Sequence, residues 1–220
     1  MTDSTHVLQK YETLAANYDR RWRRYHTETF GRVVRDIQDN RPLVILDAPC
    51  GTGELIRWLL PNVPNARIVG LDGSGAMLDV ARRKWAGQPR VSFRHALADA
   101  LPFGDQTFDW VFCCSSLHYF QQPARVLAEF NRVLKPTGRL VLLDWCRNPW
   151  HCRVINWWKV RHDPTHVRMY TTQGLARLLR DTGWSVSQME RFRVSWMRGL
   201  RLWEMMEALA TPANGREVSG

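Results

Sequence analysis

The feature of this sequence that most constrains its fold is an alternation of short apolar runs with longer segments of helical period. The runs are rich in β-branched and aromatic residues and occupy 42–47, 67–72, 91–95, 108–114 and 139–144. Between several of them, apolar residues recur every three or four positions, as they do on the buried face of a helix. Strands and crossover helices that alternate in this way form a parallel sheet covered by helices. The chain is therefore predicted to be a doubly wound α/β domain.

Turn-forming and capping residues set the expected ends of the helices. One helix is expected over 53–60, where a proline stops it, and a second follows Ser74, whose hydroxyl can cap it. A third begins at Pro123, a residue that suits the first turn of a helix. The helical pattern weakens over 145–170, and 186–209 fits either a strand pair or a basic amphipathic helix.

Composition narrows the class of protein. The chain has 220 residues, 45% of them hydrophobic, which fits one folded domain. No apolar run approaches the roughly 18 residues that span a bilayer, and the N-terminus lacks the basic and apolar regions of a signal peptide. The five cysteines are irregularly spaced, unlike a disulfide framework. We therefore expect a cytoplasmic protein.

The net charge of +10 leaves two interpretations open. It can attract an anionic partner such as nucleic acid, a membrane surface or an acidic substrate. It can equally reflect solvated arginines whose stems cover apolar surface, since the basic residues are spread along the chain.

Two strand ends point to a ligand. The first strand ends at Asp47 and continues into a turn with Gly51 and Gly53, where backbone amides can approach a ligand at a helix N-terminus. The second strand ends at Asp72, 21 positions beyond Gly51, where a carboxylate can bind ribose hydroxyls. A dinucleotide site would carry a third glycine where Ile56 stands, and Asp47 would repel a pyrophosphate. These residues indicate a nucleoside joined to a group that carries an ammonium, such as an amino acid.

Five ordered motifs follow one another along the chain, at 46–53, 70–78, 98–109, 117–120 and 132–138. In this order they resemble the class I S-adenosylmethionine-dependent methyltransferases, in particular the small-molecule, type 11-like group. The resemblance extends over about 11–184, most of the chain. It implies a Rossmann-like sheet of seven strands, mostly parallel with an antiparallel last strand, with helices on both faces. It also implies S-adenosyl-L-methionine as the cofactor.

The resemblance implies a role for each part of the crevice. Asp47 and the backbone of 51–53 hold the methionine end of the cofactor, Asp72 holds the ribose, Met77 flanks the adenine, and Ser115 lies near the sulfonium. The full set of implied cofactor-binding residues is Tyr18, Asp47, Ala48, Gly51, Gly53, Asp72, Gly73, Met77, Ala98, Asp99 and Ser115.

Two positions depart from the pattern of that family. Pro49 stands where a glycine is usual, which removes one amide donor. Leu97 stands where an aspartate commonly binds the adenine amino group, so either Asp99 or a water takes that bond or the bond is absent.

The residues after the fourth strand suggest the chemistry. Methyl transfer from a sulfonium is an in-line displacement, which alignment of the acceptor and exclusion of water accelerate. An oxygen or ammonium acceptor must also lose a proton, and His118 is the predicted base, with a packing role as the alternative. The predicted substrate-binding residues are Tyr11, Tyr119, His166 and Tyr170. A nearby histidine-rich segment matches no zinc spacing, so no metal is expected.

The predicted organisation has three parts in a single methyltransferase domain. Lid helices over 1–40 close on the cofactor, 41–144 forms the cofactor-binding core, and 145–220 supplies a substrate loop and the last part of the sheet. The physical reason for a mobile aromatic lid is the exclusion of water from the reacting centre.

Two acceptor classes remain open. The first is an oxygen or nitrogen of a small molecule. The second is a membrane-associated lipid or quinone at an anionic surface, suggested by the basic run 20–24 and by Trp157, Trp158 and Trp196. Nucleic-acid methylation and nicotinamide-dependent reduction have less support, because no base-gripping turn or pyrophosphate motif is present. The sequence does not indicate an oligomeric state.

Overall fold

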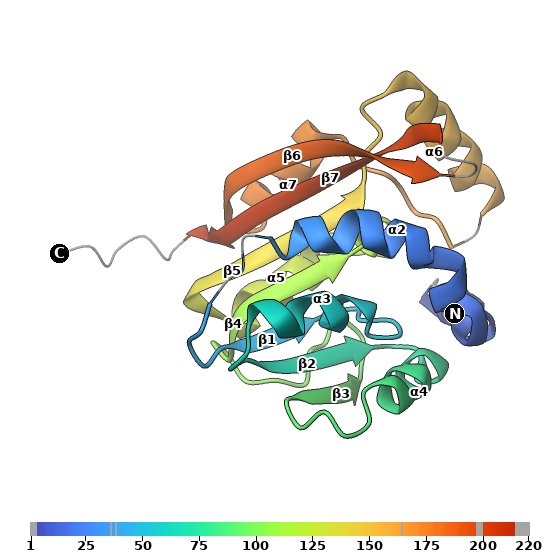
Figure 1. Ribbon diagram of the computed structural model, residues 1–220. Coiled ribbons are helices and arrows are strands. Elements are labelled where there is room, and N and C mark those ends of the chain that lie inside the picture. The colour runs from blue at the N-terminus through green and yellow to red at the C-terminus, as the bar shows by residue number, and fades with distance from the viewer. Residues whose placement is uncertain (1–3, 36, 38, 164, 197–199, 214–220) are drawn as a thin grey trace.

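The computed structural model describes residues 4–35, 37, 39–163, 165–196 and 200–213. Within these residues, seven strands form one sheet in the order β3-β2-β1-β4-β5-β7-β6 (Figure 1). β7 runs antiparallel to both of its neighbours, and the other pairs are parallel. The strands are β1 (Val44–Asp47), β2 (Arg67–Asp72), β3 (Val91–His95), β4 (Phe108–Cys114), β5 (Leu134–Trp145), β6 (Trp184–Trp196) and β7 (Leu200–Pro212). The prediction of a Rossmann-like sheet with an antiparallel last strand is confirmed.

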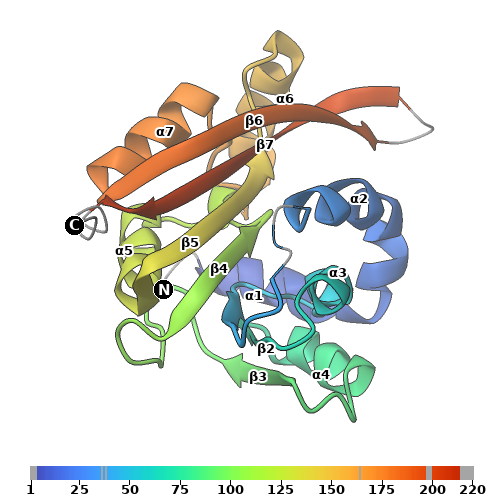
Figure 2. The ribbon, with the colours of Figure 1, turned by 60° about the vertical axis from the view of Figure 1, so that its left-hand side comes forward.

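Helices cover both faces of the sheet (Figure 2). Apolar side chains of α2 and α3 pack into the core on one face, and those of α5 and α7 pack into the core on the other. The helices are α1 (Ser4–Leu14), α2 (Tyr18–Val33), α3 (Glu54–Asn62), α4 (Gly75–Lys84), α5 (Pro123–Val133), α6 (Trp150–His162) and α7 (Thr172–Asp181), with short 3-10 turns η1 (Ala15–Asn17) and η2 (Leu117–Tyr119).

The expected capping residues begin their helices. The Ser74 hydroxyl accepts a hydrogen bond from the Met77 amide at the start of α4, at 3.3 Å. Pro123 occupies the first turn of α5, where its missing N–H removes no helical hydrogen bond. Both helices follow strands whose carboxyl ends meet at one edge of the sheet, so the caps help to fix the loops at that edge.

Three local expectations were wrong. α3 continues through Pro61 to Asn62, because the Val63 amide still donates to the Leu59 carbonyl at 3.1 Å. β5 begins at Leu134 and not at Arg139, because Leu134 pairs with the first residue of β4 ahead of an irregularity in register.

The third error concerns the segment after β5. Residues 150–162, expected within a substrate loop, form the helix α6. The last segment, which fitted either a strand pair or a helix, is the antiparallel pair β6 and β7. Among the helices that the structure describes, none combines the length and apolar content needed to cross a membrane.

Candidate functional site

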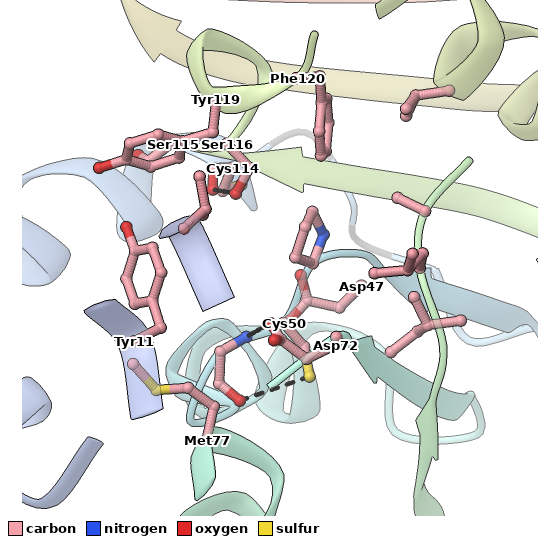
Figure 3. A pocket seen from close by; sticks show the side chains of 18 of the residues that line it. Tyr11, Asp47, Cys50, Asp72, Met77, Cys114, Ser115, Ser116, Tyr119 and Phe120 are labelled. Carbon is pink, nitrogen blue, oxygen red and sulfur yellow. Dashed lines mark hydrogen bonds between the residues drawn. The ribbon is translucent and has the colours of Figure 1, made fainter. Parts of the chain in front are cut away.

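A cavity of about 530 Å³ opens at the carboxyl ends of β1, β2 and β4. Its volume falls within the range of roughly 300–1,000 Å³ that is usual for small-molecule sites. Its walls come from the loops after these strands, from the segment after β3 and from the helices α1 to α5. Figure 3 shows two sides of the hollow, with Asp47, Cys50 and Asp72 from the β1 and β2 ends facing Cys114 and Tyr119 from the end of β4.

The turn after β1 is fastened to the end of β2. The Cys50 amide donates to the Leu71 carbonyl at 2.8 Å, and the Gly51 amide donates to Asp72 Oδ2 at 2.8 Å. Gly51 and Gly53 have φ angles of 54° and 71°, in the left-handed region that glycine adopts without steric cost. The sequence therefore needs glycine at both positions to turn from β1 into α3 beside the cavity.

Asp72 is oriented for a further polar partner. Its Oδ1 accepts from the Ser74 amide at 2.8 Å, opposite the bond from Gly51 to its Oδ2. Burial raises the pKa of this carboxyl, although the Ser74 and Gly51 amides oppose that shift. Each carboxylate oxygen has two lone pairs, so Asp72 retains acceptor capacity for ribose hydroxyls.

Asp47 is a buried carboxyl at the end of β1 that lines the cavity. The side chain is 2% exposed, and its Oδ2 is buried without a hydrogen-bond partner in the described part of the chain. Burial raises its pKa well above the usual value, and the nearby charge of Asp72 adds to the effect. A buried acceptor of this kind is costly unless a ligand donates to it. An ammonium beside Asp47 and ribose hydroxyls beside Asp72 would meet these needs, so the residues fit an adenosyl amino acid.

The far end of the cavity suits a flat base. Met77 and Ala98 line it and are almost fully buried. Leu97 and Asp99 also lie on this wall, with Leu97 45% exposed. The expectation that Asp99 replaces the usual aspartate stays a prediction.

The N-terminal helices are tied to the core by charged residues. Glu12 Oε1 accepts from the Ser74 hydroxyl at 2.8 Å and from the Ala76 amide at 3.3 Å. Asp19 accepts from the Thr52 hydroxyl and pairs with Lys84, each at 2.5 Å. These bonds hold α1 and the start of α2 against the turn after β1 and against both ends of α4. The role of these helices as a lid stays a prediction.

Aromatic side chains form the part of the cavity under these helices. The ring of Tyr11 lies edge-on to those of Tyr119 and Tyr18, with centroids 5.8 Å and 6.0 Å apart. Burial raises the pKa of all three hydroxyls, that of Tyr119 to about 12. They are therefore neutral hydrogen-bonding groups at physiological pH.

Ser115 connects this aromatic wall to β4. Its hydroxyl forms a short hydrogen bond with the Tyr25 hydroxyl, and its amide donates to the Leu143 carbonyl at 2.6 Å. Its φ of 56° is uncommon for a residue with a side chain, and such conformations cluster at functional sites. The bend brings the end of β4 against α2.

His26 is a cavity residue that the sequence analysis missed. Its ring stacks on Phe30 with centroids 4.7 Å apart, and burial lowers its pKa to about 4, so the imidazole is neutral at pH 7. The sequence contained a signal for this position, because Tyr25 and His26 follow Tyr18 by seven and eight residues. That spacing places all three on one face of a helix.

The predicted base lies behind the cavity wall. His118 Nδ1 donates to Asp144 Oδ1 at 2.6 Å, while its Nε2 is buried with no partner among the described residues. The ring lies 3.9 Å, centroid to centroid, from Tyr119, which lines the cavity, whereas His118 itself does not. The base role of His118 therefore stays a prediction that requires Tyr119 to turn aside.

The cavity brings together most of the predicted site residues. Besides His118, four predicted residues lie outside its lining: Ala48 and Gly53, which shape the turn, His166, which bonds to α6, and Tyr170, which forms a bridge with Cys146. His166 Nε2 donates to Asn156 Oδ1 at 3.1 Å. Within the described residues, no cluster of three or more His, Cys, Asp or Glu side chains suits a metal ion. The predicted residues that do line the cavity are Tyr11, Tyr18, Asp47, Gly51, Asp72, Gly73, Met77, Ala98, Asp99, Ser115 and Tyr119.

Comparison with known proteins identifies relatives of the chain. A family model described as a methyltransferase domain matches residues 45–138. The demethylmenaquinone methyltransferase of Thermus thermophilus is 39% identical over 133 residues, which cover 60% of this chain and 57% of that protein. The chain thus spans little more than half the length of this relative. The ubiquinone/menaquinone biosynthesis C-methyltransferase UbiE of Geobacter sulfurreducens is 30% identical over 186 residues, which cover 82% of this chain and 70% of that protein.

Solved structures share the fold. A Haloferax volcanii protein, solved in complex with the Trm112 methyltransferase activator, aligns with a TM-score of 0.77 and 21% identity over 92% of this chain and 97% of its own. A SAM-dependent methyltransferase from Aquifex aeolicus aligns with a TM-score of 0.65 and 20% identity over 84% of this chain and 89% of its own. With the glycine turn, the two strand-end carboxylates and the similarity to the Geobacter relative, the chain belongs to the class I methyltransferases, whose cofactor is S-adenosyl-L-methionine.

Proposed function

We propose that this chain transfers a methyl group from S-adenosylmethionine to a ring carbon of a hydroxylated aromatic acceptor of the quinol class. The observation that carries the proposal is the division of the cavity into two chemically different parts. The charged residues of the described lining come from the β1 and β2 ends, from the segment after β3 and from α3 and α5, while the lid and the β4 end contribute only neutral side chains.

The charged part suits the cofactor. When bound, S-adenosylmethionine supplies an electrophilic methyl group on a positively charged sulfur. Asp47 would accept from the ammonium and Asp72 from the ribose hydroxyls, while the Gly51–Gly53 turn allows close backbone approach. Ser115, at the bend after β4, would then lie beside the methyl group.

The neutral part suits a flat, uncharged acceptor. Tyr11, Tyr18, Tyr119 and Phe120 offer ring faces and edges, and aromatic pairs gain about 0.5–1.5 kcal/mol beyond area burial. A charged acceptor would lose its hydration there without an opposite charge in return. The names of the curated relatives support a quinone acceptor and C-methylation in preference to the oxygen or nitrogen acceptor expected first.

The chain must also assist loss of a proton from the acceptor. A ring carbon becomes nucleophilic when a neighbouring hydroxyl loses its proton. We propose His118 as the base, because Asp144 orients the ring through Nδ1 while Nε2 has no partner among the described residues and would be the nitrogen that accepts the proton. Neutral His26, which lines the cavity, would accept a hydrogen bond from a second hydroxyl.

The test uses purified protein, methyl-deuterated cofactor and a soluble demethylnaphthoquinol kept reduced. We expect the product to gain one labelled methyl group on a ring carbon, assigned by fragmentation in mass spectrometry. The matched control is the same quinol already methylated at that carbon. Label on a hydroxyl oxygen of either compound, or no label on the quinol while an amine or a catechol is methylated, would refute the proposed acceptor.

A further inference from the structure

The exposed side of α6 is apolar, which is unusual for a surface helix. The large hydrophobic side chains with substantial exposure in the described chain are Leu97, inside the cavity, and five residues of α6. Trp150 is 76% exposed, and the other four are 48–55% exposed. These five residues are Trp150, Val154, Trp157, Trp158 and Val160.

The spacing concentrates this apolar surface on one side. Trp150, Val154 and Trp157 are separated by four and three residues, so they lie on the same face of the helix. Cys152 and Asn156, on the opposite face, are buried against the protein. A surface helix normally has the reverse arrangement, with its apolar stripe on the core.

Polar bonds on the inner side fix this orientation. Asn156 Oδ1 accepts from the Met169 amide at 2.6 Å as well as from His166. Lys159 Nζ lies 5.2 Å from the centroid of the Trp145 ring and 3.4 Å from Asp163 Oδ2. Turning α6 to bury its tryptophans would break these contacts, so the apolar face points outward in the folded protein.

The positive charge of α6 indicates that its partner is anionic. α6 contains no acidic residue. Arg153 and Arg161 are exposed, and no ion pair joins either of them to another residue in the described chain. The guanidinium of Arg161 lies 4.4 Å from the centroid of the Trp157 ring, so cation and aromatic ring share one surface. A second copy of the chain would oppose these cations with its own, whereas an anionic partner would neutralise them.

We propose that α6 docks the protein onto the interface of an anionic lipid bilayer. Tryptophan and arginine are suited to the boundary between headgroups and acyl chains. A helix that lies in this boundary buries its apolar face while cations contact anionic headgroups. A nucleic-acid backbone would satisfy the arginines but offers no apolar layer for Val154.

α6 lies at the same edge of the sheet as the candidate site. In Figure 1, α6 lies at the edge toward which β4 and β5 point, the edge that carries the cavity. Asp163, which follows α6, pairs with Lys10 of the lid helix at 3.2 Å. Docking through α6 would hold the cavity near the bilayer surface, where a lipid-soluble quinol is found. Only this last step rests on the proposed function.

Vesicle flotation tests the docking without cofactor or acceptor. The full chain is mixed with phosphatidylcholine vesicles with and without phosphatidylglycerol. We expect binding only to the anionic vesicles, with quenching of tryptophan fluorescence by brominated acyl chains. The double variant Trp150→Ser/Trp157→Ser should weaken partitioning at least about tenfold, and Arg153→Gln/Arg161→Gln should weaken it about fivefold per arginine, an effect that salt masks.

A matched control variant distinguishes the effect of the α6 arginines from the effect of the net charge of the protein. Arg20→Gln/Arg23→Gln removes two cations from α2 and should leave vesicle binding within about twofold, since those residues lie outside α6. An equal loss in this control would overturn the assignment to α6. So would wild-type binding in the tryptophan variant, or a change in oligomeric state or RNA affinity with no change in vesicle binding.

The same variants separate docking from catalysis. Trp150→Ser/Trp157→Ser should keep its melting temperature and its turnover of a water-soluble quinol, and should lose turnover only of a quinol held in vesicles. If no quinol is a substrate but vesicle binding follows α6, the acceptor assignment fails and the docking assignment stands.

Discussion

Replacing Asp47 with asparagine should make the ligand-free protein more stable and the cofactor bind less tightly. Asp47 is 2% exposed, its Oδ2 has no partner in the described chain, and Asp72 adds a like charge nearby. The amide of Asp47→Asn has nearly the same shape and carries no charge. Because the two effects have opposite signs, a general disruption of the fold cannot reproduce both.

The magnitudes follow from burial and hydrogen bonding. A buried acceptor without a partner costs more as a charged carboxylate than as a neutral amide, and we take the difference to be about 1–3 kcal/mol. Relief of that cost should raise the melting temperature by about 3–10 °C in a domain of this size. A hydrogen bond to a charged partner contributes about 1.5–3 kcal/mol. Its loss should weaken binding of S-adenosylhomocysteine by about 10- to 150-fold.

The pH dependence has a definite sign. The pKa of Asp47 is raised in the folded state above its unfolded value of about 3.9. The stability that protonation gives is present below about pH 3.9 and is lost as pH rises through the raised pKa. In the wild type the free energy of unfolding therefore falls across this window, and Asp47→Asn should remove part of that fall. Binding of S-adenosylhomocysteine should weaken on acidification in the wild type and change less in the variant.

Calorimetry with two ligands isolates the contact. S-adenosylhomocysteine carries the ammonium, whereas 5′-methylthioadenosine lacks the amino-acid end. Asp47→Asn should weaken only the first ligand, and the matched variant Asp72→Asn should weaken both. Equal losses for the two ligands in Asp47→Asn, or a lower melting temperature without ligand, would refute the placement of the ammonium at Asp47.

Three further predictions concern the base, the lid and the packing of the sheet. His118→Gln should lower kcat at least about 100-fold with little change in the Kd of S-adenosylhomocysteine, and unchanged turnover would leave His118 a packing role. Glu12→Gln weakens the bonds that this carboxylate accepts at the start of α4, so hydrogen exchange in α1 should quicken and the ligand should dissociate faster; an unchanged exchange rate would contradict the lid contact. Gly70→Ala would place a Cβ 2.7 Å from the Phe93 ring, so urea unfolding should show a loss of about 1–3 kcal/mol, and wild-type stability would mean that the ring can move aside.

The strands and most of the site could be predicted because their signals are local. The run Phe108–Cys114 is apolar except for Asp109 and mostly buried between helices on both faces, as its composition indicated. Asp47 and Asp72 end adjacent parallel strands, so the topology alone brings their carboxylates together. The glycines between them are required by backbone conformation. Each of these features depends on a few neighbouring residues, which the sequence displays directly.

The positions of His118, His166 and Tyr170 depend on packing between distant segments. The sequence places His118 just after β4 but does not indicate that Tyr119, packed against it, lines the cavity while His118 does not. His166 is held by Asn156 of α6, a helix whose period gave no clear signal. His26 belongs to the cavity because α2 crosses the strand ends, a tertiary fact that helical spacing alone does not fix.

α6 was expected to be a loop because its apolar side chains face solvent and its buried face is polar. Prediction from periodicity assumes that the apolar face of a helix is the buried one. In α6 the buried face carries Asn156, whose side-chain oxygen receives two hydrogen bonds, so polar contacts hold the helix with Trp150 and Trp157 outward. Leaving those rings in water forgoes apolar burial worth roughly 25 cal/mol per Å². Burial of these rings by another apolar phase would recover that free energy. The orientation of α6 therefore indicates a binding partner outside the chain.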